Sequence, residues 1–83
     1  MQFSGEFCAQ CRRNLNVFRH ALGVHPQVDF REISVEEHQD LVRSLNIRRT
    51  PTVFFVAGPN APVTRTEGAI TSQELANTLN TLS

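Results

Sequence analysis

The sequence has little cysteine, no excess of charge of either sign and no long apolar run. Its 83 residues contain two cysteines, and eight basic side chains balance eight acidic ones. A balanced charge gives no electrostatic basis for binding nucleic acid or an anionic membrane. No stretch approaches the roughly 20 apolar residues of a membrane span, and the N-terminus lacks a charged-then-apolar signal region. We therefore expect a cytoplasmic protein with neither nucleic-acid nor membrane partners.

The scarcity of cysteine also argues against a secreted disulfide framework. Cys8 and Cys11 are three residues apart, and a disulfide that closes so short a loop constrains the unfolded chain very little. The pair therefore suits a redox or metal-binding role better than a structural one. With 40% hydrophobic residues, the chain can bury one small core, so we expect a single domain over residues 1–83.

The cysteine pair falls at the predicted start of a helix. Residues 1–3 can form the end of a strand and residues 4–6 a loop, and apolar side chains recur at helical spacing over residues 9–22, with Gly23 as the expected stop. Unpaired backbone N–H groups and the positive end of the helix dipole favour a thiolate over a thiol at a helix N-terminus. The sequence therefore predicts a reactive cysteine at position 8.

A second strand and a second helix are predicted next. Residues 28–33 are rich in β-branched and aromatic side chains, which is typical of a strand. Ser34 and Glu37 have the spacing of a capping box, so a helix is expected to begin at Ser34 and to end at Asn46. Its predicted buried side chains are Leu41, Val42 and Leu45.

The last third of the chain predicts a hairpin and a final helix. The continuous apolar run 53–56 is typical of a strand covered on both faces, and residues 63–67 alternate like a half-exposed antiparallel strand. Thr71 and Glu74 form a second capping-box pattern. The apolar face of the final helix is predicted to be Leu75, Leu79 and Leu82. The order β-α-β-α-β-β-α predicts an α/β fold with a mixed four-stranded sheet flanked by helices.

In this arrangement, two segments resemble the thioredoxin superfamily: Phe7-Cys8-Ala9-Gln10-Cys11 at the first helix and Arg49-Thr50-Pro51-Thr52 at the third strand. Gly68-Ala69-Ile70-Thr71, before the last helix, is also similar, and the resemblance covers essentially the whole chain. It implies a thioredoxin-like fold in which the Thr50–Pro51 bond is cis and Pro51 lies against the cysteine pair. The implied catalytic residues are Cys8 and Cys11, and the implied substrate-binding residues are Phe7, Ala9, Gln10, Thr50, Pro51, Gly68 and Ala69, with Ile70 at the rim of the groove.

The sequence departs from the family pattern in three places. The chain begins at the strand that leads into the cysteines, without the usual preceding strand and helix. Phe7 replaces the usual tryptophan, and Ala9-Gln10 replaces Gly-Pro, as in small redoxins that feed electrons to ribonucleotide reductase. The buried aspartate that serves the family as proton acceptor for the second cysteine falls on Gln2, so the proton path must differ.

The resemblance implies a monomeric thiol–disulfide oxidoreductase with no cofactor besides its own Cys8–Cys11 disulfide. Cys8, nearer the helix end, would attack a substrate disulfide, and Cys11 would resolve the mixed disulfide. The expected electron source is an NADPH-dependent thioredoxin reductase, and the expected substrates are disulfide-containing proteins such as ribonucleotide reductase.

Other interpretations stay open at this point. A glutaredoxin-type enzyme would use glutathione, although Ala69-Ile70 lacks the residues that usually hold the glutathione amine, and a redoxin fold can also serve as a noncatalytic binding module. Cys8, Cys11, His20 and His25 resemble a zinc-ligand set, but their spacing is too short for a zinc finger and a helix fills the gap, so no metal site is expected. Arg48 and Arg49 are expected to form a solvated turn, or else to bind an acidic partner or the carboxylates of glutathione.

Overall fold

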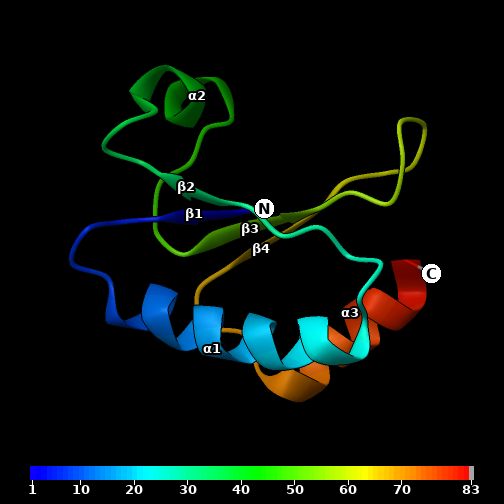
Figure 1. Cartoon of the computed structure of the whole chain (residues 1–83). Helices are drawn as coiled ribbons and strands as arrows, with labels where there is room; N and C mark the ends of the chain where they lie inside the picture. Colours follow the sequence, from blue (N-terminus) through cyan, green and yellow to red (C-terminus); the bar gives the residue numbers. More distant parts are fainter. Residues whose placement is uncertain (83) are drawn as a thin grey trace.

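The computed structural model describes residues 1–82 and shows a mixed four-stranded sheet flanked by helices (Figure 1). The elements are β1 (Gln2–Ser4), α1 (Ala9–Val24), β2 (Glu32–Ser34), α2 (Gln39–Ser44), β3 (Thr52–Phe55), β4 (Thr64–Glu67) and α3 (Ser72–Leu82). This order is the predicted one. Within the described residues, no helix combines the length and apolar character of a membrane span.

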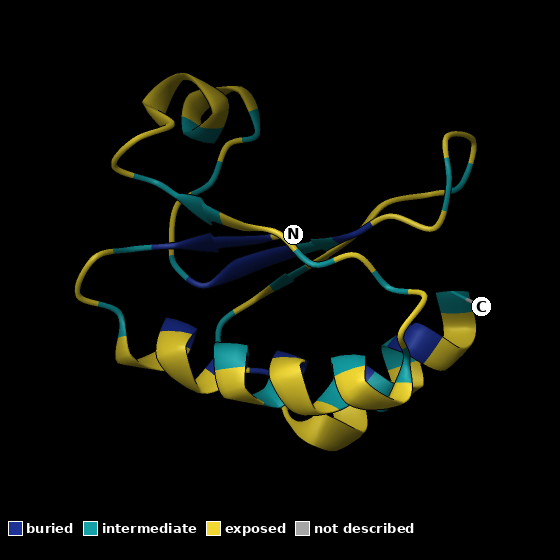
Figure 2. Cartoon of the chain, viewed as in Figure 1, coloured by how far each residue is buried: buried dark blue, intermediate teal, exposed yellow. Residues whose placement is uncertain are grey.

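The strands lie in the order β2-β1-β3-β4. β1 and β2 are parallel, as the connection through α1 requires, and β3 is antiparallel to both β1 and β4. β1 and β3 therefore occupy the centre of the sheet, which Figure 2 shows as its most buried part. The loop from β1 into α1 leaves this centre directly, so it carries the cysteines to one end of the sheet (Figure 1).

The two faces of the sheet are covered by different helices. Figure 1 shows α1 and α3 together on one face and α2 on the other. Because side chains alternate along a strand, Gln2 and its neighbour across the ladder, Val53, share the face under α1 and α3, whereas Phe3 points to the opposite face. There the Phe3 ring meets the Phe54 ring edge to face, with centroids 5.8 Å apart. The polar residue Gln2 is thus placed beneath the cysteine-bearing helix.

The main core lies between the sheet and the helices α1 and α3. Phe18 of α1 stacks against Phe30 at 4.8 Å and approaches Phe55 of β3 at 6.5 Å between ring centroids. The members of this buried cluster are Phe18, Val53, Phe55, Ile70, Leu75 and Leu79. Leu75 and Leu79 confirm the predicted apolar face of the final helix, and Leu82 is partly buried against the same cluster.

The first helix is longer than the sequence predicts. It continues through Gly23 to Val24, and His25 still donates its backbone N–H to the Ala21 carbonyl at 2.9 Å. Gly23 is an ordinary helical residue, because Gly68 is the only glycine with a positive φ in the described chain. The helix ends because Pro26 disfavours the helical conformation at His25, whose φ and ψ are −121° and 70°. The prediction that Gly23 stops the helix was wrong.

The second strand is shorter than predicted and begins later. Instead of residues 28–33, only Glu32–Ser34 pair with β1, which itself has three residues. Val28 and Phe30, whose apolar character suggested a strand, pack against the main core from an irregular segment. Their contact with the helix layer explains why they are apolar. They do not need to pair in the sheet to be buried.

The helix expected from Ser34 begins five residues later, at Gln39. The Ser34 hydroxyl does accept the Glu37 N–H at 3.4 Å, but this bond closes a turn at the end of β2. Leu41 was expected in the core and is exposed, at 37% of its maximal accessible surface. The other two predicted positions, Val42 and Leu45, are only half-buried. The six-residue helix has no buried residue, so the apolar spacing alone overestimated its packing.

Candidate active site

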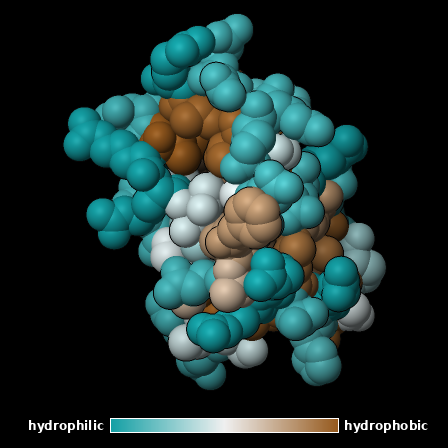
Figure 3. Space-filling model, turned by 90° about the vertical axis from the view of Figure 1, so that its left-hand side faces the viewer, coloured by the Kyte–Doolittle hydropathy of each residue, from teal (hydrophilic) through white to brown (hydrophobic). Residues whose placement is uncertain are grey.

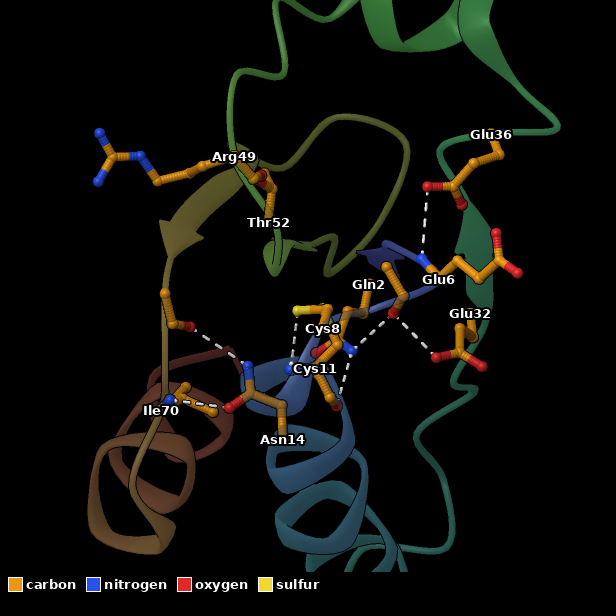
Figure 4. The surroundings of a disulfide bond; sticks show 12 residues. Gln2, Glu6, Cys8, Cys11, Asn14, Glu32, Glu36, Arg49, Thr52 and Ile70 are labelled. Carbon is orange, nitrogen blue, oxygen red and sulfur yellow. Dashed lines mark hydrogen bonds between the residues drawn. A yellow bond between two sulfur atoms is a disulfide. The ribbon is translucent and has the colours of Figure 1, made fainter.

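Cys8 caps the N-terminus of α1. Its backbone is extended, with φ −120° and ψ 97°, and its Sγ accepts the backbone N–H of Cys11 at 3.1 Å. The two cysteines form a disulfide, with their Cα atoms 5.2 Å apart (Figure 4). Because the first N–H groups of a helix have no intrahelical acceptor, a sulfur at this position lies in a field that favours negative charge. The structure therefore confirms the predicted helix-start environment of Cys8.

The two sulfur-bearing residues differ in their access to solvent. Cys11 is 2% exposed, whereas Cys8 is half-buried and its neighbours Ala9 and Gln10 are exposed. Phe7, directly before the pair, is 93% exposed. Figure 3, which views the end of the molecule that carries this loop, shows apolar surface framed by hydrophilic side chains. A reagent approaching from this side meets Cys8 first.

The loop before β3 lies next to the cysteine loop. The Thr50–Pro51 peptide bond is cis, and Pro51 is buried. Gly5 lies between the two loops: a Cβ at Gly5 would come within 3.2 Å of Thr50 Oγ1 and 3.8 Å of Cys8 Cβ. Two segments some forty residues apart in the sequence thus meet at Gly5, where there is little room for a side chain.

The segment before α3 completes the surroundings of the cysteine pair. Gly68 has φ +85°, in the left-handed region that glycine adopts without strain. Its N–H donates to the Pro51 carbonyl at 2.8 Å, which links this segment to the β3 loop. Ala69 is exposed, but Ile70 is 7% exposed and belongs to the main core. The expectation that Ile70 forms part of the groove rim was therefore wrong, because its side chain points inward.

Asn14 fastens this segment to α1. It is 1% exposed, its Nδ2 donates to the Gly68 carbonyl at 3.2 Å, and its Oδ1 accepts the Ile70 N–H at 3.0 Å. The side chain lies one turn after Cys11 and reaches toward Ile70 in Figure 4. A single amide thus fixes the Gly68–Ile70 backbone relative to the helix that carries the cysteines.

A chain of hydrogen bonds leads from Cys11 to the protein surface. Gln2, which is fully buried, donates from Nε2 to the Cys11 carbonyl at 3.2 Å and to Ser4 Oγ at 2.9 Å. Ser4 Oγ donates in turn to Glu32 Oε2 at 2.8 Å, and Glu32 is exposed. Figure 4 shows this chain running from the cysteines across β1 to β2. The position expected to lack an acid is therefore occupied by a neutral amide with a carboxylate at the far end of its hydrogen-bond chain.

Charge is distributed unevenly around the site. A hollow beside the cysteine loop is lined by Glu6, Glu32, Glu36 and Glu37, and the Glu6 N–H donates to Glu36 Oε2 at 3.3 Å. On the other side, Arg49 pairs with Glu67 at 3.4 Å. The Arg49 side chain remains 69% exposed, which agrees with a solvated turn. Within residues 1–82, no group of three or more His, Cys, Asp or Glu side chains is arranged to hold a metal ion.

The model of the thioredoxin family matches residues 1–81. The chain belongs to the thioredoxin family. Thioredoxin H2-1 of Oryza sativa subsp. japonica is 32% identical over 82 residues, which is 99% of this chain and 58% of that protein. Thioredoxin H4-2 of the same species is 35% identical over 54 residues, or 65% of this chain and 41% of that protein. The chain thus spans about half the length of these thioredoxins.

The fold of a thioredoxin is also found by structural comparison. The crystal structure of chloroplastic thioredoxin z, described as defining a type-specific target recognition, superimposes with a TM-score of 0.88. The match covers 98% of this chain and 74% of that chain at 22% sequence identity. At this level of identity the likeness establishes the fold, and it confirms the thioredoxin-like α/β architecture that the sequence predicts.

Sequence reasoning placed the cysteine, Thr50–Pro51 and Gly68 segments correctly side by side but missed three polar residues behind them. Asn14, Ser4 and Glu32 were not singled out. Asn14 had a detectable signal, because it lies three residues after Cys11 and four before Phe18, on the buried stripe of an amphipathic helix. Ser4 and Glu32 had none, since their pairing depends on the parallel register of β1 with β2.

Proposed function

We propose that the chain is a small thiol–disulfide oxidoreductase that reduces disulfide bonds in other proteins. One observation carries the proposal: an accessible cysteine caps a helix, and a second, buried cysteine lies one turn behind it at disulfide distance. The helix N-terminus favours the thiolate form of Cys8, which is the nucleophilic form. Membership of the thioredoxin family supports the same chemistry.

The reaction runs in two exchanges. The Cys8 thiolate attacks one sulfur of the substrate disulfide, a Cys8–substrate bond forms, and the other substrate sulfur leaves as a thiolate that takes up a proton. Cys11 then loses its proton and attacks Cys8 Sγ, which forms the Cys8–Cys11 disulfide and releases the second substrate thiolate. The substrate gains two electrons and the protein loses two. Because Cys8 caps α1 and Cys11 lies in its first turn, the second exchange is intramolecular and avoids the entropy of a second encounter.

A groove for the substrate backbone is proposed on the surface around Cys8. The backbone N–H and C=O of Thr50 make no hydrogen bond to another residue in the described part of the chain, so they are available to an extended substrate segment in the manner of strand addition. Pro51 and Gly68 hold this backbone in place through the 2.8 Å bond between them. The exposed Phe7 and Ala69 supply apolar contacts, and Ala9 and Gln10 contact the substrate beside the attacked sulfur.

The electron source and the substrate class are parts of the same proposal. We assign the reducing equivalents to NADPH through a flavoprotein thioredoxin reductase, and the substrates to disulfide proteins of the ribonucleotide reductase kind. Support comes from the Ala9-Gln10 dipeptide between the cysteines and from the absence of a Gly-Gly pair at Ala69-Ile70. A monomer in the cytoplasm suits this role, because a reducing compartment keeps a lone cysteine pair cycling.

Two coupled assays test the assignment. In the first, NADPH and thioredoxin reductase regenerate the protein while insulin disulfides serve as substrate; in the second, glutathione and glutathione reductase replace the reductase. We expect NADPH oxidation in the first assay and little in the second. Activity in the second assay alone would identify a glutaredoxin-type enzyme. A Cys8→Ser, Cys11→Ser double variant that retains full biological function would instead identify a noncatalytic binding module.

A further inference from the structure

Gln2 carries a buried hydrogen-bond acceptor that has no donor. The residue is 0% exposed, and both hydrogens of its amide nitrogen are used, one by the Cys11 carbonyl and one by Ser4. Its Oε1 is buried and has no hydrogen-bond partner among the described residues 1–82. Buried polar atoms are nearly always paired, so an unpaired one beside a reactive disulfide calls for an explanation.

The orientation of this amide is fixed by its neighbours. The Cys11 carbonyl can only accept, so the amide must turn its nitrogen toward it. Ser4 Oγ gives its proton to the Glu32 carboxylate and must accept from Gln2. The exchange of nitrogen and oxygen would therefore break both bonds, and Oε1 is held on the remaining side of the amide, which Figure 4 shows next to the cysteine pair.

Reduction creates a hydrogen-bond donor in Cys11, the residue that the Gln2 amide already contacts through its nitrogen. In the disulfide neither sulfur has a proton, but reduction gives Cys11 an S–H group in a residue that is 2% exposed and so has almost no access to water. The S–H needs an acceptor, and Gln2 Oε1 needs a donor. We propose that in the reduced protein Gln2 Oε1 accepts a hydrogen bond from the Cys11 thiol and holds it protonated until the mixed disulfide has formed at Cys8.

This inference rests on the proposed exchange reaction, and it adds a reason why the two cysteines ionise at different stages. A neutral thiol that donates to an amide oxygen is favoured over a thiolate facing the same oxygen, so Cys8, which faces backbone N–H groups, ionises first. An amide cannot act as a base near neutral pH. The Cys11 proton therefore passes to the substrate thiolate that leaves as Cys11 attacks Cys8, and Ser4 and Glu32 act as positioning residues that orient the amide.

The first test needs no variant and no redox partner. Side-chain amide signals of Gln2 are followed by NMR in the oxidised protein and after reduction with a phosphine. We expect them to shift on reduction and to shift again with pH as Cys11 ionises, whereas the signals of Gln27, beyond the far end of α1, stay constant. Gln2 signals that are identical in the two redox forms would overturn the proposal.

The second test removes the Gln2 side-chain oxygen and keeps a side chain of similar volume. In Gln2→Met, the Cys11 thiolate fraction at a fixed pH, read from its ¹³Cβ shift, is expected to rise roughly tenfold, the equivalent of one neutral hydrogen bond. Gln27→Met is the matched control and should leave the Cys11 thiolate fraction unchanged. Glu32→Gln, which removes the charge but keeps an acceptor for Ser4, should also have little effect. If Glu32→Gln alone shifts Cys11 ionisation, the carboxylate governs the thiol and the proposal is wrong.

Failure of the Gln2–Cys11 hydrogen bond can be distinguished from failure of the proposed oxidoreductase function. Both measurements use chemically reduced protein, so they report on the Gln2–Cys11 contact whether or not thioredoxin reductase accepts the chain. Conversely, a protein active with NADPH and thioredoxin reductase but with an unresponsive Gln2 would retain the oxidoreductase assignment and lose only this inference.

Discussion

The two faces of the sheet are covered in different ways. On one face, α1 and α3 bury a continuous apolar cluster that includes Phe18 and Leu75. On the other face, α2 contributes no buried residue. Its C-terminal end is held instead by Arg65 of β4, whose guanidinium donates to the carbonyls of Leu45 at 2.7 Å and Asn46 at 3.0 Å.

This difference bears on the function because every residue of the cysteine network lies on or beside the packed face. Cys11 and Asn14 project from the buried side of α1, and Gln2 lies beneath them on β1. A site that must hold sulfur atoms and a substrate backbone in register benefits from a rigid support. α2 itself contributes no buried residue and is bound at its end by Arg65, so we expect changes within α2 to leave the cysteine chemistry intact.

The largest expected effect concerns the cysteines themselves. Cys8→Ser should abolish disulfide reduction, a loss of at least roughly a thousandfold, because the attacking thiolate is gone. Cys11→Ser should stop turnover after the first exchange and accumulate mixed disulfides through Cys8, detectable on nonreducing gels and by mass spectrometry. Mixed disulfides that accumulate in Cys8→Ser instead would show that Cys11 is the attacking residue.

Core truncations on the two faces should differ by several kcal/mol. Phe18→Ala removes a buried ring that contacts Phe30 and Phe55, and should lower the free energy of unfolding by about 3–5 kcal/mol. Leu41→Ala, on the exposed α2, should cost less than about 1 kcal/mol. Urea denaturation of both variants measures the contrast. Equal losses would mean that α2 is packed as firmly as α1.

A polar substitution inside the packed face should affect substrate use as well as stability. Asn14→Leu leaves the Gly68 carbonyl and the Ile70 N–H without their partner, which should cost about 2–3 kcal/mol. Because Gly68 then loosens beside Thr50–Pro51, KM should rise for a protein disulfide but not for a small aromatic disulfide that needs only Cys8. Asn16→Leu, on the exposed side of α1, is the control. A rise in KM for both substrates would contradict a role in the groove.

The two helices of the packed face are also the elements that the sequence predicts well. Helical periodicity located α1 and α3, because burial of a whole apolar stripe leaves a strong pattern. The cysteine pair and Thr50–Pro51 could be brought together only through a resemblance that covers the chain, since no local signal specifies that contact. Asn14 was missed because one polar residue does not change the pattern of an apolar stripe, and the pattern does not show that its side chain binds the backbone of another segment.

The segment from the end of α1 to the end of α2 was predicted poorly for a physical reason. Val28 and Phe30 have strand-forming side chains, but their positions are decided by packing against α1, which lies outside any local window. α2 is fixed at its end by Arg65, twenty residues away in the sequence, and this contact has no periodic signature. Where polar bonds to distant residues fix the position of a helix or strand, the sequence pattern predicts which of the two forms but not where it begins and ends.

The Arg65 contact gives the next prediction. Arg65→Met keeps an apolar stem but removes the donors to Leu45 and Asn46, and should cost about 1–2 kcal/mol. The effect should be local, with faster hydrogen exchange in α2 and unchanged exchange in α1. Arg31→Met, which removes only an exposed ion pair with Asp29, is the matched control and should be nearly neutral. Faster exchange throughout the protein would refute independent attachment of α2.

The smallest expected effect separates the two capping-box patterns. Thr71 forms the complete box: its hydroxyl accepts the Glu74 N–H at 3.1 Å, and Glu74 Oε1 accepts the Thr71 N–H at 3.2 Å. Thr71→Ala should therefore lower the free energy of unfolding by about 1 kcal/mol. Ser34 caps no helix: its hydroxyl accepts the Glu37 N–H at 3.4 Å and donates to Glu36 Oε1 at 3.2 Å, and both bonds lie within an exposed turn.

Ser34→Ala should consequently cost less than about 0.5 kcal/mol, as expected of an exposed turn. Paired urea denaturation curves of the two variants, with equal slopes, give the difference directly. Because the two segments share the same spacing of hydroxyl and carboxylate, a larger loss at Ser34 would mean that α2 begins at Ser34 in solution, and that the α2 side is more ordered than its polar attachment implies.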